Sequence, residues 1–258
     1  MPRCFTVFFL AALWLSGSTP VVAQPKLLSV IGIAAPVTSN NSFSHRVAYR
    51  EQHTISPQQH TVVYTDAQGH TLARKQIHYQ HGYTTPEYQL QDIIHHRNSG
   101  SAWQDGHFVV YRQEGEQRQS EKVVQPSSNT VIDAGFDYFI RRHWDALIDG
   151  KTLPFTLIVA DPLTELHMQV AEVSTAQTAI PQHSEHYRYF LVNSSNPLIR
   201  WVIPTLHLAY DRDSQLLQVY QGPSNIPDSA GKVQTVNIQY SYTLPPVSAS
   251  MPPPPQLH

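Results

Sequence analysis

The sequence contains almost no sulfur and little charge. Its one cysteine is Cys4, so the chain beyond the N-terminus excludes disulfides, thiolate metal sites and a cysteine nucleophile. Charged residues make up only 14% of the chain and the net charge is −2 at pH 7, which gives no electrostatic reason to expect binding to nucleic acid or to anionic lipid. The 11 glycines form neither a phosphate-binding loop nor a Gly-x-Ser-x-Gly nucleophile motif.

The N-terminal segment has the order of a secretory signal peptide. Arg3 precedes an apolar run from Phe5 to Leu15, and small or turn-forming residues follow up to Ala23. The run of about 11 residues is too short to span a bilayer core of roughly 30 Å as a helix, and no later segment reaches 18 consecutive apolar residues. We therefore predict a cleaved signal peptide over residues 1–23, an extracytoplasmic address, and no transmembrane span after cleavage. A retained N-terminal anchor is the alternative.

The rest of the chain favours a single β-rich domain. After an irregular lead-in over residues 24–42, apolar and polar residues alternate through much of residues 43–243, as in half-buried strands. Residues 61–64 and 72–79 form the first clear hairpin, and Gly69 supplies the positive φ that the turn between them needs. Residues 244–258 contain the run Pro252–Pro255 and are expected to form a disordered, proline-rich tail.

One segment, residues 133–149, departs from the strand pattern. Asp133 is the expected N-cap, Gly150 the expected stop, and Asp137 and Arg141 form an i, i+4 pair. The apolar stripe at helical spacing consists of Phe136, Phe139, Ile140, His143, Trp144 and Leu147. The predicted fold class is mostly β: a curved antiparallel sheet or open half-barrel of about ten strands, with one amphipathic helix packed against it.

Several short motifs carry a resemblance to known proteins. They are Ala48-Tyr49-Arg50-Glu51, Asp66-Ala67-Gln68-Gly69 with Leu72-Ala73-Arg74-Lys75, Ala134-Gly135-Phe136-Asp137 with Trp144-Asp145-Ala146-Leu147, and the segment from Tyr220 to Ile226. Together they resemble an exported family of Gram-negative bacterial proteins of unknown function, over residues 45–242. The order of elements is also similar, more distantly, to the half-barrel of periplasmic lipoprotein carriers. These resemblances imply a periplasmic or envelope protein with an apolar concave face, and a hydrophobic ligand.

Aromatic and apolar side chains provide the candidate ligand site. Pockets for small molecules are lined mainly by such side chains with a few polar groups. The predicted ligand-binding residues are Phe136, Phe139, Ile140, His143, Trp144 and Trp201. The alternative is that the same side chains fill a solid core.

The 15 histidines raise the alternative of an enzyme. The pairs His78/His81 and His183/His186 are three residues apart, which on a strand places the two side chains on opposite faces and disfavours a chelating pair. We therefore expect no metal, no cofactor and no catalytic residue. A hydrolase-like enzyme would need His143 or a paired histidine within hydrogen-bonding distance of Asp, Glu or Ser in an open cleft.

The function that the sequence predicts is binding. The expected partners are a lipid or other apolar ligand held in the half-barrel, or another envelope protein, and a purely structural subunit is a third reading. These hypotheses differ in what they require of the concave face of the sheet. Ligand binding requires that face to be hollow, with a cavity of roughly 300 Å³ or more.

Overall fold

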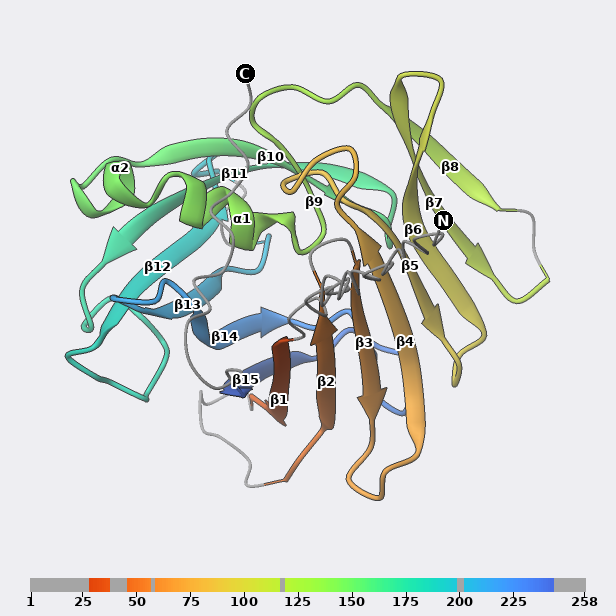
Figure 1. Cartoon of the computed structure of the whole chain (residues 1–258), viewed down its shortest axis with the longest axis horizontal. Helices are drawn as coiled ribbons and strands as arrows, with labels where there is room; N and C mark the ends of the chain where they lie inside the picture. Colours follow the sequence, from red (N-terminus) through yellow and green to blue (C-terminus); the bar gives the residue numbers. More distant parts are fainter. Residues whose placement is uncertain (1–27, 38–45, 57–58, 117–118, 199–201, 244–258) are drawn as a thin grey trace, which may run out of the picture.

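The computed structural model describes residues 28–37, 46–56, 59–116, 119–198 and 202–243. The expected signal peptide (1–23) and tail (244–258) lie outside the described residues. The described part of the chain forms one open sheet of 15 strands and two short helices (Figure 1). The mostly β fold is therefore confirmed, whereas the expected strand number of about ten was too low and the single expected helix is two.

The elements follow one another along the chain as a long meander. The strands are β1 (Leu28–Pro36), β2 (Tyr49–Ile55), β3 (Gln59–Thr65), β4 (Thr71–His78), β5 (Glu87–Asp92), β6 (Arg97–Gln104), β7 (His107–Glu114), β8 (Ser120–Val124), β9 (Thr130–Ile132), β10 (Leu153–Val159), β11 (Thr164–Val173), β12 (Tyr187–Ser194), β13 (Leu206–Asp211), β14 (Leu217–Pro223) and β15 (Thr235–Thr243). The helices are α1 (Gly135–Arg142) and α2 (Trp144–Ile148).

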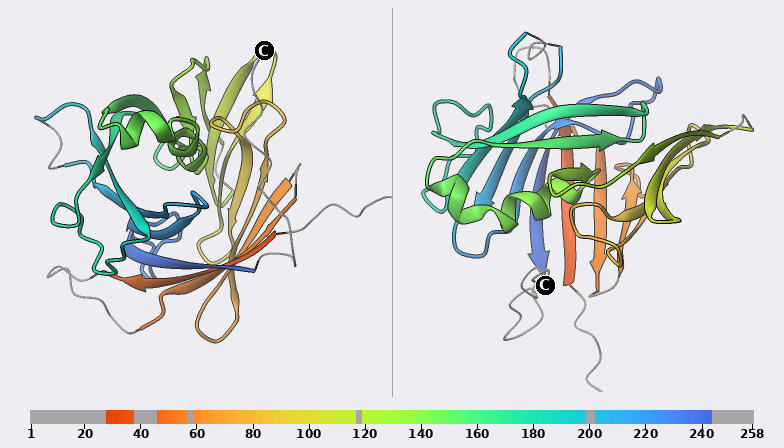
Figure 2. Two further views of the ribbon diagram at one scale, coloured as in Figure 1. Left: turned by 60° about the vertical axis from the view of Figure 1, so that its left-hand side comes forward. Right: turned by 90° about the horizontal axis from the view of Figure 1, so that it is seen from above.

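The strand order explains why the sheet is barrel-like but open. Across the sheet it runs β8 to β1, then β15 to β9, so the consecutive strands β8 and β9 stand at opposite ends. Neighbouring strands are antiparallel, except that β9 and β10 are parallel. The sheet curls until its two ends approach, and Val124 of β8 and Ile132 of β9 belong to one cluster of buried side chains (Figure 2). An ion pair of 3.3 Å between Arg112 and Asp161 also joins the two ends.

The two helices cover one half of the concave face. Their buried side chains Phe139, Ile140, Trp144 and Leu147 belong to a second buried cluster, with side chains of β9 to β13. The rings of Trp144 and Phe190 lie 5.2 Å apart and tilted, a favourable aromatic geometry. The opposite half of the concave face, formed by β1 to β5, has no helix on it (Figure 1).

The helical segment differs from its prediction in two respects. The chain breaks at His143, whose φ of −107° and ψ of 20° lie outside the helical region and separate α1 from α2. The N-cap is Ala134, without a side-chain hydrogen bond, because the carboxylate of the expected cap Asp133 pairs with Lys75 instead. The Asp137–Arg141 pair is confirmed at 3.0 Å.

Three strands, β1, β6 and the short β9, were not predicted from the sequence. β1 lies where the irregular lead-in was expected, and it pairs with β2 on one side and β15 on the other. Its inward positions include Gly32 and Ala34, which carry little hydrophobic signal although Ala34 is fully buried. In β6, Gly100 also carries no hydrophobic signal. It lies on the outer face with Gln89, and its missing side chain leaves room for the Tyr88 carbonyl and the Tyr111 ring.

We predict that Gly135→Ala destabilises the protein by about 2 kcal/mol, the usual cost of forcing atoms into a filled site. A Cβ at this position would lie 2.1 Å from the carbonyl oxygen of Thr84, in the loop before β5. Thermal or urea unfolding measures the change. Arg142→Ala, at an exposed position of the same helix, is the control and should change stability by less than about 0.5 kcal/mol. Equal stability of the two variants would contradict the close approach of α1 to this loop.

Candidate functional site

The concave face of the sheet is hollow. A cavity of about 1190 Å³ lies between β1 to β5 on one side and β10, β11 and β13 to β15 on the other, and α1 runs along it. Binding sites for small molecules usually measure roughly 300–1,000 Å³. The cavity is therefore large enough for an extended ligand, which the binding hypothesis requires.

Aliphatic and tyrosine side chains make up most of the cavity wall. Apolar walls of this kind bind ligands by removing apolar surface from water. The leucine, isoleucine and valine members are Leu28, Val30, Ile55, Val62, Ile77, Leu90, Leu157, Ile158, Val159, Leu166, Ile203, Leu206, Leu216, Leu217, Ile226, Val233 and Ile238. The tyrosines are Tyr49, Tyr64, Tyr79, Tyr83, Tyr88, Tyr138, Tyr220, Tyr240 and Tyr242.

The structure places the predicted ligand-binding residues in different surroundings. Phe136 lines the cavity. Phe139, Ile140 and Trp144 are buried in the cluster between the helices and the sheet. Trp201 lies outside the described residues.

His143, the remaining predicted residue, does not line the cavity. Its Nδ1–H donates to the carbonyl oxygen of Phe139 at 2.9 Å, and the two rings lie 4.4 Å apart. Most of the apolar stripe of α1 and α2 therefore packs in the core, whereas Asp137, Tyr138 and Arg141 of α1 line the cavity.

A row of hydrogen-bonded polar side chains runs along the wall formed by β2, β3 and β4. His53 Nε2 donates to the Glu51 carboxylate at 2.8 Å, and His53 Nδ1 lies 2.8 Å from His60 Nε2. His60 Nδ1 lies 3.2 Å from the Tyr79 hydroxyl. We refer to Glu51, His53, His60 and Tyr79 as the polar row.

One proton arrangement satisfies every contact of the polar row. With both imidazoles neutral, His60 Nε2–H donates to His53 Nδ1 and the Tyr79 hydroxyl donates to His60 Nδ1. Burial, and then the charges of His53 and Lys75, lower the pKa of His60 to about 3. His60 is therefore neutral near pH 7, and all donors of the row point towards Glu51.

A buried ion pair fixes the start of α1 to the wall. Lys75 of β4 bonds the carboxylate of Asp133, and the two side chains are only 4% and 8% exposed. Asn225 Nδ2 donates to the other Asp133 oxygen at 3.0 Å. The Lys75 ammonium also lies 4.9 Å from the centre of the Tyr88 ring, a cation–π distance. Asp133 has a φ of +49°, a backbone conformation that Asp and Asn tolerate better than most residues.

Three tyrosines and a second ion pair border the cavity at α1. The rings of Tyr79, Tyr83 and Tyr138 lie 4.8–5.1 Å apart. The Arg141 guanidinium stands 4.4 Å from the Tyr138 ring centre and pairs with Asp137 at 3.0 Å. Burial is the main reason why the pKa of Tyr79 is raised, so this hydroxyl stays protonated and can donate.

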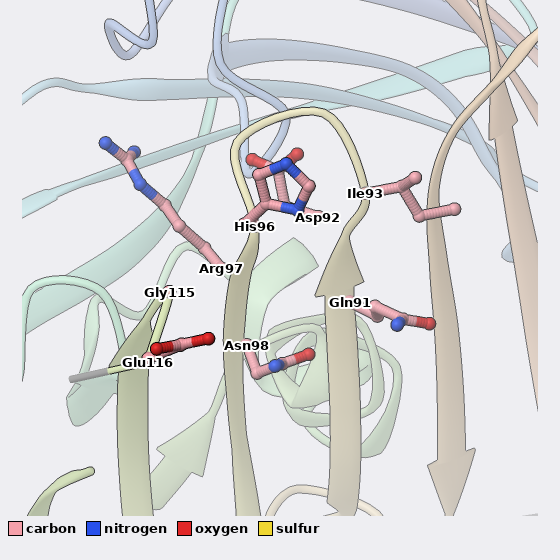
Figure 3. A pocket seen from close by; sticks show the side chains of 8 residues that line it. All are labelled: Gln91, Asp92, Ile93, His96, Arg97, Asn98, Gly115 and Glu116. Atoms are coloured by element: carbon pink, nitrogen blue, oxygen red, sulfur yellow. The ribbon is translucent and has the colours of Figure 1, made fainter. Parts of the chain in front are cut away.

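The histidine pairs His78/His81 and His183/His186 of the sequence analysis are exposed, and the adjacent His95 and His96 lie at the rim. His81 Nδ1 bonds Glu87 at 3.0 Å, and His95 Nδ1 bonds Asp92 at 2.8 Å. His95 and His96 sit at the turn between β5 and β6, where a smaller hollow of about 530 Å³ opens (Figure 3). In the part of the chain that the structure describes, no group of three or more His, Cys, Asp or Glu side chains is arranged to hold a metal ion.

The likeness to known structures is one of fold. No protein-family model matches the sequence, and no curated protein matches it. A crystal structure of a beta-barrel-like protein of a domain of unknown function, DUF1849, from Brucella abortus is similar with a TM-score of 0.52 and 9% sequence identity. The match covers 86% of this chain and 99% of that one. Of the helices described, none is long and apolar enough to cross a membrane.

Sequence reasoning missed the polar row. Tyr49, Glu51 and His53 alternate along β2 and so share one face, which is a signal that the sequence does contain. Their connection to His60 depends on the register of β2 and β3, in which Ile55 faces His60.

We predict that Lys75→Met costs about 3 kcal/mol or more, because it leaves the buried Asp133 carboxylate without its cation. The double variant Lys75→Met/Asp133→Asn should recover most of this loss, since Asn keeps the backbone conformation and bears no charge. Denaturant unfolding of both variants is the measurement. Lys122→Met breaks a more exposed pair of 3.5 Å with Glu165 and, as control, should cost less than about 1 kcal/mol. A double variant no more stable than the single one would refute the pairing.

We predict that His60 makes the protein less stable in acid. Its pKa falls from 6.5 to about 3 in the folded chain, so between these pH values the unfolded chain binds a proton that the folded chain does not. Stability therefore drops as pH falls through this window, by up to about 1.4 kcal/mol per pH unit from this one group. His60→Gln should flatten the pH dependence of unfolding, and His78→Gln, at an exposed position, should not. Identical slopes in the two variants would exclude a buried neutral His60.

Proposed function

We propose that the chain is an exported, non-enzymatic binding protein that holds a small amphipathic molecule in the cavity between β1 to β5 and β10 to β15. The observation that carries the proposal is the volume of about 1190 Å³ behind a wall of aliphatic and tyrosine side chains. The predicted signal peptide gives the address, the periplasm or envelope of a Gram-negative cell. Transfer of the ligand to another envelope protein is part of the same hypothesis.

The polar side chains of the wall argue for an amphipathic ligand over a purely apolar one. Glu51 is 5% exposed and Lys75 4%, and buried charges are costly unless they have partners. A ligand with a polar head can complete their hydrogen bonds, whereas its apolar part lies along the aliphatic wall.

The alternative, a hydrolase-like enzyme, has one observation in its favour. His53 lies 2.8 Å from the Glu51 carboxylate inside a cavity, as a histidine general base requires. However, both nitrogens of His53 and of His60 are engaged within the polar row. Neither imidazole has a free nitrogen to take a proton from a substrate, so binding is the better supported function.

We predict that filling the cavity abolishes ligand binding. Leu157 and Leu166 face each other across β10 and β11, and both line the cavity. The double variant Leu157→Trp/Leu166→Trp should lower the affinity for the apolar fluorescent probe N-phenyl-1-naphthylamine at least about tenfold, measured by titration. Native mass spectrometry of the full chain extracted from the envelope should also show a bound small molecule in the unmodified protein and little in the double variant.

The control is His167→Trp, which adds a tryptophan at an exposed position of β11 next to Leu166. It should leave probe affinity unchanged. If the double variant and the control bind the probe equally, or if the unmodified chain neither binds it nor carries a molecule from the cell, the proposal fails.

A further inference from the structure

The charges around the cavity are predominantly negative. Carboxylates are twice as numerous as basic side chains among the described residues that line it. The acidic members are Glu51, Asp92, Asp133, Asp137, Asp161 and Asp213, and the basic members are Lys75, Arg97 and Arg141. Such a lining raises the local concentration of cations over that of anions.

Most of these carboxylates already have a partner. Asp133 pairs with Lys75, Asp137 with Arg141, and Asp161 with Arg112. Asp92 accepts hydrogen bonds from backbone N–H groups and from His95, and Asp213 lies exposed after β13. The basic side chains are engaged as well, since Arg97 pairs with Glu114 at 3.2 Å. Among the described residues, each basic side chain of the cavity wall therefore already pairs with a carboxylate, and an anionic ligand meets no unpaired cation there.

Glu51 is the exception. Its side chain is 7% exposed, and its one ion-pair partner among the described residues is His53, which carries no charge when neutral. A buried carboxylate without a lysine or arginine is costly unless another cation reaches it. Its Oε1 atom forms no hydrogen bond in the polar row, and the donors of the row end at Oε2.

Tyrosines lie beside this carboxylate, since Tyr64 of β3 is its cross-strand partner and Tyr49 precedes it on the same face of β2. Burial first, and the Glu51 charge second, raise the pKa values of Tyr49, Tyr64, Tyr220 and Tyr240. The missing side chain of Gly32 leaves room for Glu51 and Tyr240 side by side, because a Cβ there would lie 3.1 Å from Glu51 Oε2 and 2.9 Å from the Tyr240 ring. Aromatic rings around a carboxylate match the chemistry of ammonium recognition, in which the ring faces attract the cation.

We propose that Glu51 and the tyrosines around it form a binding site for the cationic head group of the ligand, a protonated amine or a quaternary ammonium. The apolar tail of the same molecule lies against the aliphatic wall. With this ligand bound, the cation lies beside the Glu51 carboxylate, of which Oε2 already accepts a hydrogen bond from His53. The inference rests on the proposed function and assigns the chemical class of the ligand.

Three probes with the same tail and different heads test the assignment. Decyltrimethylammonium, decanoate and 1-decanol, each below its micellar concentration, are titrated at pH 8 against the full chain loaded with N-phenyl-1-naphthylamine. The cation should displace the fluorescent probe at a concentration about tenfold or more below that of decanoate. Glu51→Gln should abolish this preference, so that the cation and decanoate displace the fluorescent probe at similar concentrations. The control Asp213→Asn should keep the preference.

The outcomes separate this inference from the proposed function. If the unmodified chain does not bind the fluorescent probe, the proposed function fails. If it binds the probe but prefers decanoate or 1-decanol, or if Glu51→Gln keeps the preference for the cation, only the head-group assignment fails. Should Glu51→Gln not fold, His53→Gln decides: removal of the group that competes for Glu51 should strengthen the preference for the cation, and an unchanged preference overturns the assignment.

Discussion

The packing of α1 and α2 on one half of the concave face is the interaction on which the rest of the structure depends. Side chains such as Phe139, Trp144 and Leu147 fill the space over β9 to β13 and so form the core between the helices and the sheet. The cavity lies beside this core, between β1 to β5 and β10, β11 and β13 to β15, and α1 borders both: Phe139 packs in the core and Phe136 lines the cavity.

A hollow interior lacks the dispersion contacts of a filled core. Other contacts must therefore stabilise the curved shape of the sheet. One buried cluster joins the two ends of the sheet through Val124, Ile132 and Ile158. The Lys75–Asp133 pair joins the wall of β4 to the chain before α1. Lys75, Asp133 and Ile158 themselves line the cavity, so the contacts that keep the sheet curved are part of the cavity wall.

Much of the fold could be predicted from the sequence, because alternation along strands such as β4 and the spacing of Phe139, Ile140 and Trp144 are local signals. β1 could not, since Gly32 and Ala34 are small where the interior requires space. The role of Asp133 was mistaken for a helix cap, because its partner Lys75 is 58 residues away. The helix stripe also predicted ligand contacts, but a stripe shows only that side chains are buried, not whether a core or a cavity receives them.

The polar row could not be predicted from any one strand, because its members come from β2, β3 and the residue after β4. Each residue alone has the pattern of an ordinary strand residue. Only the register of β2 with β3 and of β3 with β4 brings Glu51, His53, His60 and Tyr79 into one line. This cross-strand origin also fixes where a charge can reside. Since burial keeps His60 neutral, the row carries no positive charge at that residue, and its one carboxylate stands at the opposite end, in Glu51. A ligand that enters the cavity therefore meets an apolar wall along its length and one carboxylate at a defined place.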